Sequence, residues 1–266
     1  MKYLLTLTLT LSFACGDDDG TDFDAGGGTD AGVDSGMVDT GVDAAPEVRC
    51  EPTSSACVDE QIVQLGLFDN IAEGGIENED LGTHWRTRID ARGGGFMTSQ
   101  SYLYLRFTDG GAEKLELSDE TAFDSGDWDM AFRRFVMRLN SGVSGPSCVA
   151  AGRTAADTDF DTLAAVPDGL AFRTEEYYST PDCSVVPDGS GLGSPGTALA
   201  SYWTYRSCVE MTGNVYVVQL PSGRHIKLEV ETYYTPEVQV ACDRDGMLPP
   251  GPSGSGNVQI LWAFID

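Results

Sequence analysis

The sequence predicts a mainly β fold: a single β-rich domain over residues 47–266, with one or two short helices and support from disulfides. Apolar and polar residues alternate with a period of two in several segments, which is typical of half-buried strands. Clusters of glycine and proline separate these segments, as turns do. Six cysteines lie in the same region, and an even number indicates disulfides if the chain is exported.

The chain begins with the features of a signal peptide over residues 1–14. Lys2 precedes an apolar run at 3–13 that is too short to span a bilayer. The run ends in Ser-Phe-Ala before Cys15, which resembles a bacterial lipoprotein signal. We therefore expect Cys15 to be lipidated and to become the mature N-terminus. Gly16 gives no signal for retention in the inner membrane, so we expect an outer-membrane anchor, with the domain exposed to the periplasm or the cell surface.

The composition of residues 15–46 predicts a disordered tether between this anchor and the domain. The stretch 16–46 contains nine Asp, no Lys or Arg, and almost no large apolar residue. Such a segment cannot bury enough apolar surface to offset the entropy lost on ordering. It also lacks the calcium-binding loop patterns that Asp-rich repeats can form.

The net charge excludes two classes of partner. Of the formal charge of −26, the tether carries −9 and residues 47–266 carry −18, with Lys2 in the signal making up the difference. A chain this acidic does not bind nucleic acid through general phosphate attraction. Nor does it dock on anionic lipid by charge, so we expect membrane contact only through the lipid anchor.

The first strands of the domain follow from its alternating segments. Residues 85–90 alternate as one strand, and residues 102–107 and 113–117 form a hairpin around a Gly-rich turn at 109–111. Residues 130–139 fit a strand or a short helix, and the β context favours a strand.

The second half of the domain follows the same pattern. Residues 159–166 are the best candidate for a helical turn, which the Pro-Asp-Gly sequence at 167–169 ends. A clearer hairpin joins residues 214–220 to 224–234 through Pro-Ser-Gly. The last strand is expected at 258–265.

The cysteines predict three disulfides in the exported body. Fifteen pairings are open, and Cys50 and Cys57 are close enough in sequence to close a small loop. A Cys-x-x-Cys pattern is absent, which argues against a structural zinc or thioredoxin-type site. The cysteines assigned to disulfides are Cys50, Cys57, Cys148, Cys183, Cys208 and Cys242.

Enzyme signatures are weak, and we expect a protein that is not an enzyme. The sequence has no Gly-x-Ser-x-Gly elbow and no His-Glu-x-x-His zinc motif. The string at 191–196 fits Gly-x-Gly-x-x-Gly but has no strand before it. Asp127 and Asp129 flank Trp128, and a turn beside a core Trp explains them better than a glycosidase pair.

Several segments resemble the HmuY-like lipoproteins of bacteria. They are GDWDMAFRR at 126–134, RLNSG at 138–142, the aromatic stretch at 202–205, and the hairpin from VYVV at 215–218 to GRHIKL at 223–228 and Tyr-Tyr at 233–234. The resemblance covers about residues 60–266. It implies an outer-membrane-anchored β protein that captures haem for uptake, often through a TonB-dependent receptor. It also implies that two axial side chains, usually His or Met, hold the iron.

Three residues are candidate haem ligands. His84 and His225 are the two histidines of the chain, and the alternation places each on the polar face of its strand. They can form a pair only if these faces meet at one cleft. Met97, in a Gly-rich loop, is the third candidate. No metal other than haem iron is expected.

The basic residues suggest where an anionic ligand binds. Eight of the 16 Lys and Arg residues lie between 84 and 138. Most such residues pair with carboxylates on neighbouring strands, but Arg133 and Arg134 are candidates for contacts with haem propionates. The leading hypothesis is therefore capture of haem or a related planar tetrapyrrole. The alternative is a surface lipoprotein of the same fold without haem ligation, which binds a protein or a glycan.

Overall fold

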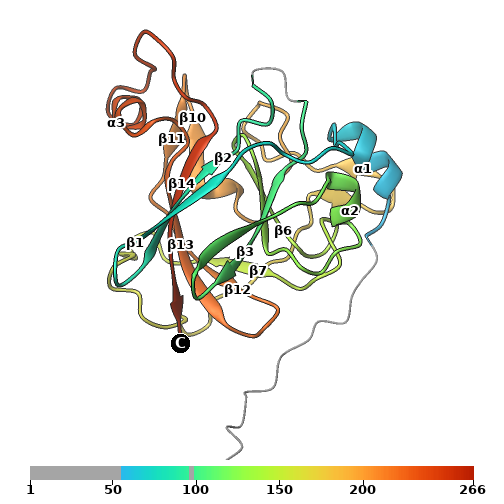
Figure 1. Cartoon of the computed structure of the whole chain (residues 1–266), viewed down its shortest axis with the longest axis horizontal. Coiled ribbons are helices and arrows are strands. Elements are labelled where there is room, and N and C mark those ends of the chain that lie inside the picture. Colours follow the sequence, from blue (N-terminus) through green and yellow to red (C-terminus); the bar gives the residue numbers. More distant parts are fainter. Residues whose placement is uncertain (1–54, 96–98) are drawn as a thin grey trace, which may run out of the picture. The chain divides into compact units, whose positions relative to one another are not determined.

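Two antiparallel sheets, one of six strands and one of four, form most of the domain (Figure 1). The structure, a computed structural model, describes residues 55–95 and 99–266. The predictions for the signal, the tether, Cys15, Cys50 and Met97 therefore lie outside the described residues. In spatial order the six-stranded sheet contains β1 (Ile76–Asp80), β2 (Trp85–Asp90), β14 (Asn257–Ile265), β13 (His225–Thr232), β12 (Val215–Gln219) and β7 (Ala150–Arg153).

The four-stranded sheet and two small ribbons complete the β structure. In spatial order the four-stranded sheet contains β4 (Gly111–Leu115), β3 (Leu103–Thr108), β5 (Met130–Arg133) and β6 (Val136–Leu139). The ribbons pair β8 (Tyr178–Ser179) with β9 (Ser184–Val185), and β10 (Trp203–Tyr205) with β11 (Val209–Met211). The mainly β prediction is confirmed, as are the hairpins β3–β4 and β12–β13 and the last strand, β14.

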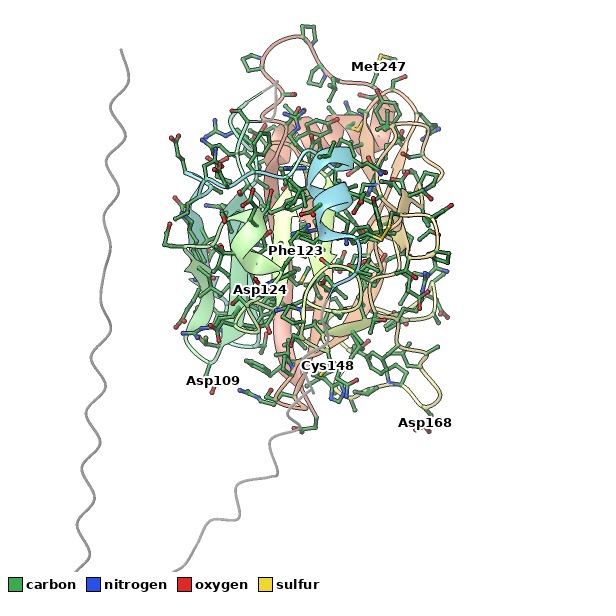
Figure 2. All side chains as sticks on the ribbon, turned by 90° about the vertical axis from the view of Figure 1, so that its right-hand side faces the viewer. Asp109, Phe123, Asp124, Cys148, Asp168 and Met247 are labelled. Carbon is green, nitrogen blue, oxygen red and sulfur yellow. A yellow bond between two sulfur atoms is a disulfide. The ribbon has the colours of Figure 1, made fainter. Side chains whose placement is uncertain are left out.

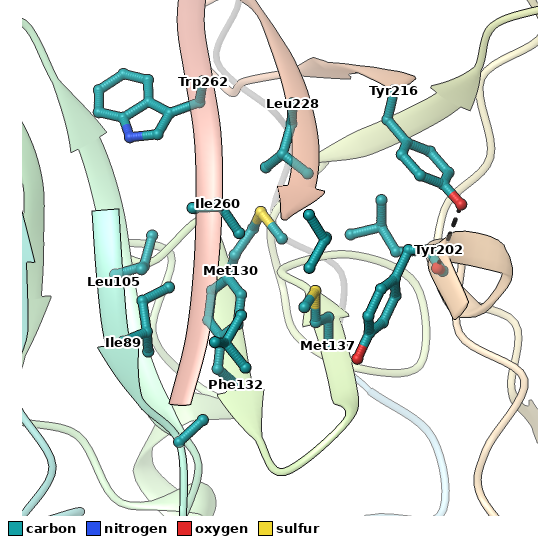
Figure 3. Close-up of a cluster of buried hydrophobic side chains, with 14 of the residues drawn as sticks. Ile89, Leu105, Met130, Phe132, Met137, Tyr202, Tyr216, Leu228, Ile260 and Trp262 are labelled. Carbon is teal, nitrogen blue, oxygen red and sulfur yellow. Dashed lines mark hydrogen bonds between the residues drawn. The ribbon is translucent and has the colours of Figure 1, made fainter. Parts of the chain in front are cut away.

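The main core lies between the inner faces of the two sheets (Figure 3). Leu105 and Met130 from the four-stranded sheet, and Leu228 and Ile260 from the six-stranded sheet, are each fully buried. Alternate residues of a strand point to opposite faces of its sheet. The period-two pattern in the sequence therefore records which residues enter this core.

The helices lie outside the core between the two sheets. Two short helices, α1 (Val58–Gln64) and α2 (Asp119–Ala122), pack on the outer face of the four-stranded sheet over Tyr104 and Trp128. Figure 2 views the molecule from this side, with Phe123 at the end of α2. The third helix, α3 (Pro236–Asp245), contacts β11, and a short 3-10 helix, η1 (Ala200–Tyr202), precedes β10.

The structure refines two local predictions. Residues 130–139 form two strands, β5 and β6, rather than one, because the chain reverses at Arg134 with φ of 55°. Residues 159–166 make only one helical turn, in which Leu163 N–H donates to Asp159 O, and no helix forms there. The Asp159 carboxylate accepts from the N–H of Asp161 at 2.8 Å, which stabilises the isolated turn.

Two disulfides join described residues. Cys57 bonds to Cys183 and Cys208 bonds to Cys242, across 126 and 34 positions of the chain. Cys57 is therefore not closed into a small loop with Cys50, which was one of the open pairings. Cys148 is also disulfide-bonded. These bonds agree with the prediction of a disulfide-supported fold.

Candidate functional site

Both histidines lie on the outer face of the six-stranded sheet, as the alternation predicted. His84 directly precedes β2, and its Nδ1 is 3.0 Å from the hydroxyl of Thr83. His225 begins β13 opposite Ile265. Burial lowers the pKa of His225, which favours the neutral imidazole at pH 7.

A long irregular segment, residues 154–173, covers this end of the outer face. Its only large buried side chain, Phe160, meets the His84 ring edge-on with 5.3 Å between centroids, while Phe172 lies 5.8 Å from the His225 ring. Lys227 Nζ donates to the carbonyl of Phe160 at 2.7 Å. Asp168, at the tip of the segment, projects from one end of the molecule (Figure 2). Aromatic rings from this segment therefore pack against both imidazoles.

A cavity of about 550 Å³ opens at a different place, beside Arg92 and Gln100. Residues 92–95 and 99–101 line one side of it, and residues 72–74 line another. Leu103 and Phe132 form an apolar floor. Neither His84 nor His225 lines this cavity. Its volume is within the range of small-molecule sites.

Arg134 lies at the rim of this cavity. Its N–H donates to Ala91 O at 2.6 Å, and its Nη1 donates to Gly95 O at 3.2 Å. Burial raises the pKa of the neighbouring Tyr233 to about 12, and the charge of Arg134 opposes that rise. The Tyr233 hydroxyl is therefore protonated at pH 7 and close to the guanidinium.

Arg133 has a different role from its neighbour. Its guanidinium donates to Leu65 O at 2.9 Å and Gly66 O at 2.8 Å, and it lies 3.5 Å from the carboxylate of Asp119. The side chain is almost fully buried and stacks over Tyr102 at 4.3 Å. It thus connects the end of α1 to the four-stranded sheet.

Sequence reasoning did not find the aromatic residues beside Arg134. Phe135 lies 5.0 Å from the Trp203 ring and 6.0 Å from the Tyr233 ring. These residues come from three distant parts of the chain, so only the fold brings them together. The available signal was the Tyr-Tyr pair at 233–234, because two large aromatics at the end of a strand seldom both face solvent.

The residues around the cavity can be compared with what a haem site requires. A haem site needs a flat apolar slot, one or two axial donors, and partners for the propionates. The described lining supplies the apolar floor and two carboxylates, Glu73 and Asp90, of which Asp90 pairs with Arg92. Arg134 is left to supply positive charge at the rim. Among the described lining residues none is His, Met or Cys. Arg134 can therefore meet the anionic edge of a tetrapyrrole, whereas the described lining supplies no axial donor.

The fold and the cavity define a two-sheet antiparallel β protein that carries a ligand-sized cavity at its loops. The HmuY protein family model matches residues 98–242, which is more than half of the chain. The chain therefore belongs to the HmuY family. No curated protein sequence matches it. In the described ranges, no helix is long and apolar enough to cross a membrane.

Three solved structures show how distant its relatives are. A Bacteroides vulgatus protein named as HmuY-like and heme-binding shares 16% identity with a TM-score of 0.42, over 71% of this chain and 97% of its own. A protein of Bacteroides fragilis, named as a lipoprotein, shares 13% identity with a TM-score of 0.39, over 69% and 92%. The apo HmuY analog of Tannerella forsythia shares 14% identity with a TM-score of 0.37, over 74% and 100%.

Proposed function

We propose that this protein binds haem or a related planar tetrapyrrole at the cavity beside residues 92–101. Membership of the HmuY family, whose members bind haem, is the observation that supports this most directly. The family consists of binding proteins rather than enzymes, and the chain lacks the usual enzyme motifs. The apolar floor and Arg134 at the rim agree with the two chemistries of such a ligand, its flat ring and its propionates.

Within this proposal, Met97 would supply a thioether sulfur to the haem iron and Arg134 would contact a propionate. A thioether is a known axial ligand of haem iron. A guanidinium forms strong charge-assisted hydrogen bonds with a carboxylate. Arg134 keeps this capacity because its Nη1 meets a neutral carbonyl, not a carboxylate.

Haem titration of the purified protein, followed by absorbance, tests the proposal. We expect a sharpened Soret band that saturates at one haem per chain. If stoichiometric haem leaves the spectrum equal to that of free haem, the proposal is wrong. The alternative of a protein or glycan ligand on the same fold would then become the leading hypothesis.

Matched variants locate the site. Met97→Leu should alter the position and intensity of the band, whereas Met130→Leu, in the enclosed core, should not. Arg134→Asn should weaken binding by about 10- to 150-fold, since one charge-assisted contact contributes about 1.5–3 kcal/mol. Asn tolerates the positive φ at this position. Arg224→Asn, which removes an exposed ion pair with Asp109, is the control and should leave affinity unchanged.

His84 and His225 define an alternative location for the ligand. If His84→Ala or His225→Ala removes the band and Met97→Leu preserves it, the ligand binds on the outer face of the six-stranded sheet. Residues 154–173 would then have to move, because Phe160 and Phe172 now contact the two rings.

We further propose that the protein is exported, lipid-anchored through Cys15 at the outer membrane, and passes its ligand to a TonB-dependent receptor. The signal-like N-terminus supports the first two steps. Cys15→Ser should abolish incorporation of labelled fatty acid and move the protein from the membrane to the soluble fraction. Unchanged labelling of this variant would contradict the anchor.

A further inference from the structure

A second cavity, of about 630 Å³, lies beside β10 and shares no lining residue with the proposed tetrapyrrole cavity. Residues 186–190 line one side of it, parts of 196–205 line another, and Arg173 also contributes to the lining. Its volume is within the range of small-molecule sites. The chemistry of its lining differs from that of the tetrapyrrole cavity and indicates a different ligand.

Backbone hydrogen bonds fix the shape of both walls. In the loop at 186–196, Asp188 N–H donates to Ser194 O and Gly196 N–H donates to Val186 O, each at 2.8 Å. The other wall continues into β10, which pairs with β11 along its length. A site with walls that are formed before binding loses less conformational entropy when a ligand enters it.

Exposed apolar side chains gather around this cavity. Val186 and Tyr205 line it and are 42% and 44% exposed, and Leu192, in the same loop as Asp188, is 42% exposed. They are three of the eight large apolar side chains that are exposed in the described part of the chain. Such a concentration beside polar groups is typical of a binding surface. The Tyr205 ring offers a flat apolar surface with a hydroxyl at its end.

The polar groups of the lining include both donors and acceptors. Arg173 and Asp188 are its charged residues, one of each sign. The Asp188 carboxylate accepts from Ser190 N–H through Oδ1 at 2.9 Å, so its Oδ2 can accept from a ligand. The exposed Arg173 guanidinium can donate, and the hydroxyls of Thr204 and Tyr205 can each donate and accept.

This combination of groups fits a neutral sugar. Each sugar hydroxyl both donates and accepts a hydrogen bond, so it can meet a guanidinium and a carboxylate in one site. The C–H face of a sugar ring is apolar and packs on an exposed aromatic ring.

Two other ligand classes fit this cavity less well. The two charges of the lining balance each other, and the net charge of −18 over residues 47–266 opposes an anionic ligand. Among the described residues that line the cavity none is His, Met or Cys, so it offers no axial donor to haem iron.

We propose that the cavity beside β10 binds a neutral saccharide, with a sugar ring on Tyr205 and sugar hydroxyls bonded to Asp188 and Arg173. The protein therefore has a glycan site in addition to the proposed tetrapyrrole site. Either site can exist without the other, because they share no lining residue.

An array of immobilised glycans, followed by calorimetric titration with a free glycan that binds, tests this site. The array carries neutral oligosaccharides of hexoses and N-acetylhexosamines beside sialylated and sulfated ones. We expect saturable binding to at least one neutral glycan. Absence of binding to every neutral glycan, or binding confined to the acidic ones, would overturn the proposal.

Matched variants place the glycan at this cavity. Tyr205→Ser should lower the affinity about tenfold, because it removes the aromatic contact and its buried area. Asp188→Asn keeps the Ser190 contact but loses a charge-assisted bond, so it should lower the affinity by about 10- to 150-fold. Met247→Ser and Asp168→Asn, at exposed residues outside the lining, are the controls and should leave it unchanged.

Haem titration of the same variants keeps the two sites distinct. Tyr205→Ser and Asp188→Asn should titrate with haem as the unmodified protein does. If both variants keep full affinity for the glycan, the saccharide does not bind at this cavity and the proposal is wrong.

Discussion

Replacement of Asp119 by Asn should be among the most destabilising isosteric changes in this protein. The carboxylate is fully buried at the start of α2. Its Oδ1 accepts from Tyr102 N–H at 2.8 Å and from the Tyr104 hydroxyl at 2.7 Å. Its Oδ2 accepts from Phe68 N–H at 3.0 Å and lies 3.5 Å from Arg133 Nη1. One side chain thus joins α2, two strand segments and the segment before β1.

The size of the loss in unfolding free energy follows from the contacts of the NH2 group that Asn introduces. If the amide oxygen keeps the Tyr102 and Tyr104 contacts, the NH2 group faces Phe68 N–H and Arg133, which are both donors. Each buried donor without an acceptor costs about 1–3 kcal/mol, and breaking a buried ion pair costs about 3–5 kcal/mol. We expect a loss of about 3–5 kcal/mol, which is a large part of the about 5–15 kcal/mol that stabilises a typical domain.

Equilibrium unfolding in urea, followed by tryptophan fluorescence, measures this loss. Asp124→Asn is the matched control, because Asp124 is exposed just after the same helix (Figure 2) and its change should stay within about 0.5 kcal/mol. If Asp119→Asn unfolds within about 1 kcal/mol of the unmodified protein, the Asp119 contacts do not have the role that the geometry assigns to them.

Three further predictions concern the framework. Joint replacement of Cys208 and Cys242 by Ser should lower the free energy of unfolding in urea by about 4 kcal/mol, because the disulfide closes a loop of 34 positions. A loss below about 1 kcal/mol would refute this. Burial raises the pKa of Glu175 to about 7, above its unfolded value. Its contribution to stability is therefore complete below about pH 4.5 and is lost as pH rises through 7. Glu175→Gln should remove about 2.5 kcal/mol of pH dependence between pH 5 and 8. Gly142→Ala should lower the thermal midpoint, since Gly142 has φ of 55° and its added Cβ would collide with Glu175 O; an unchanged midpoint would contradict that packing.

The parts of the fold that depend on local pattern were predictable from the sequence. The hairpins β3–β4 and β12–β13 combine alternation with a glycine turn, so neighbouring residues encode them. The helix α3 was also encoded locally and was missed. Its Thr235-Pro236 start and its Gly246 end, with φ of 69°, are standard boundary signals.

Other features depend on contacts that the sequence does not display. Arg134 adopts a positive φ although it is not a glycine, and its N–H bonds to Ala91 O, 43 positions earlier. No local pattern predicts that reversal, which divides the strand expected at 130–139. Likewise, Cys57 meets Cys183 only because α1 packs beside β9. The role of Met97 stays a prediction.

The structure shows which of the eight basic residues between 84 and 138 are paired with carboxylates. Pairing with carboxylates on neighbouring strands was the more common interpretation for these eight basic residues, and six of them are paired. The partners are Glu79 and Glu231 for Arg86, Glu77 for Arg88, Asp90 for Arg92, Glu113 for Arg106, Glu116 for Lys114 and Asp119 for Arg133. Within the described residues, Arg134 and Arg138 alone in this stretch form no ion pair. A guanidinium without a carboxylate has its charge available for an external anion. Arg134, at the rim of the cavity, is therefore the basic residue of this stretch that can meet a propionate, in a domain whose net charge of −18 would by itself repel anions.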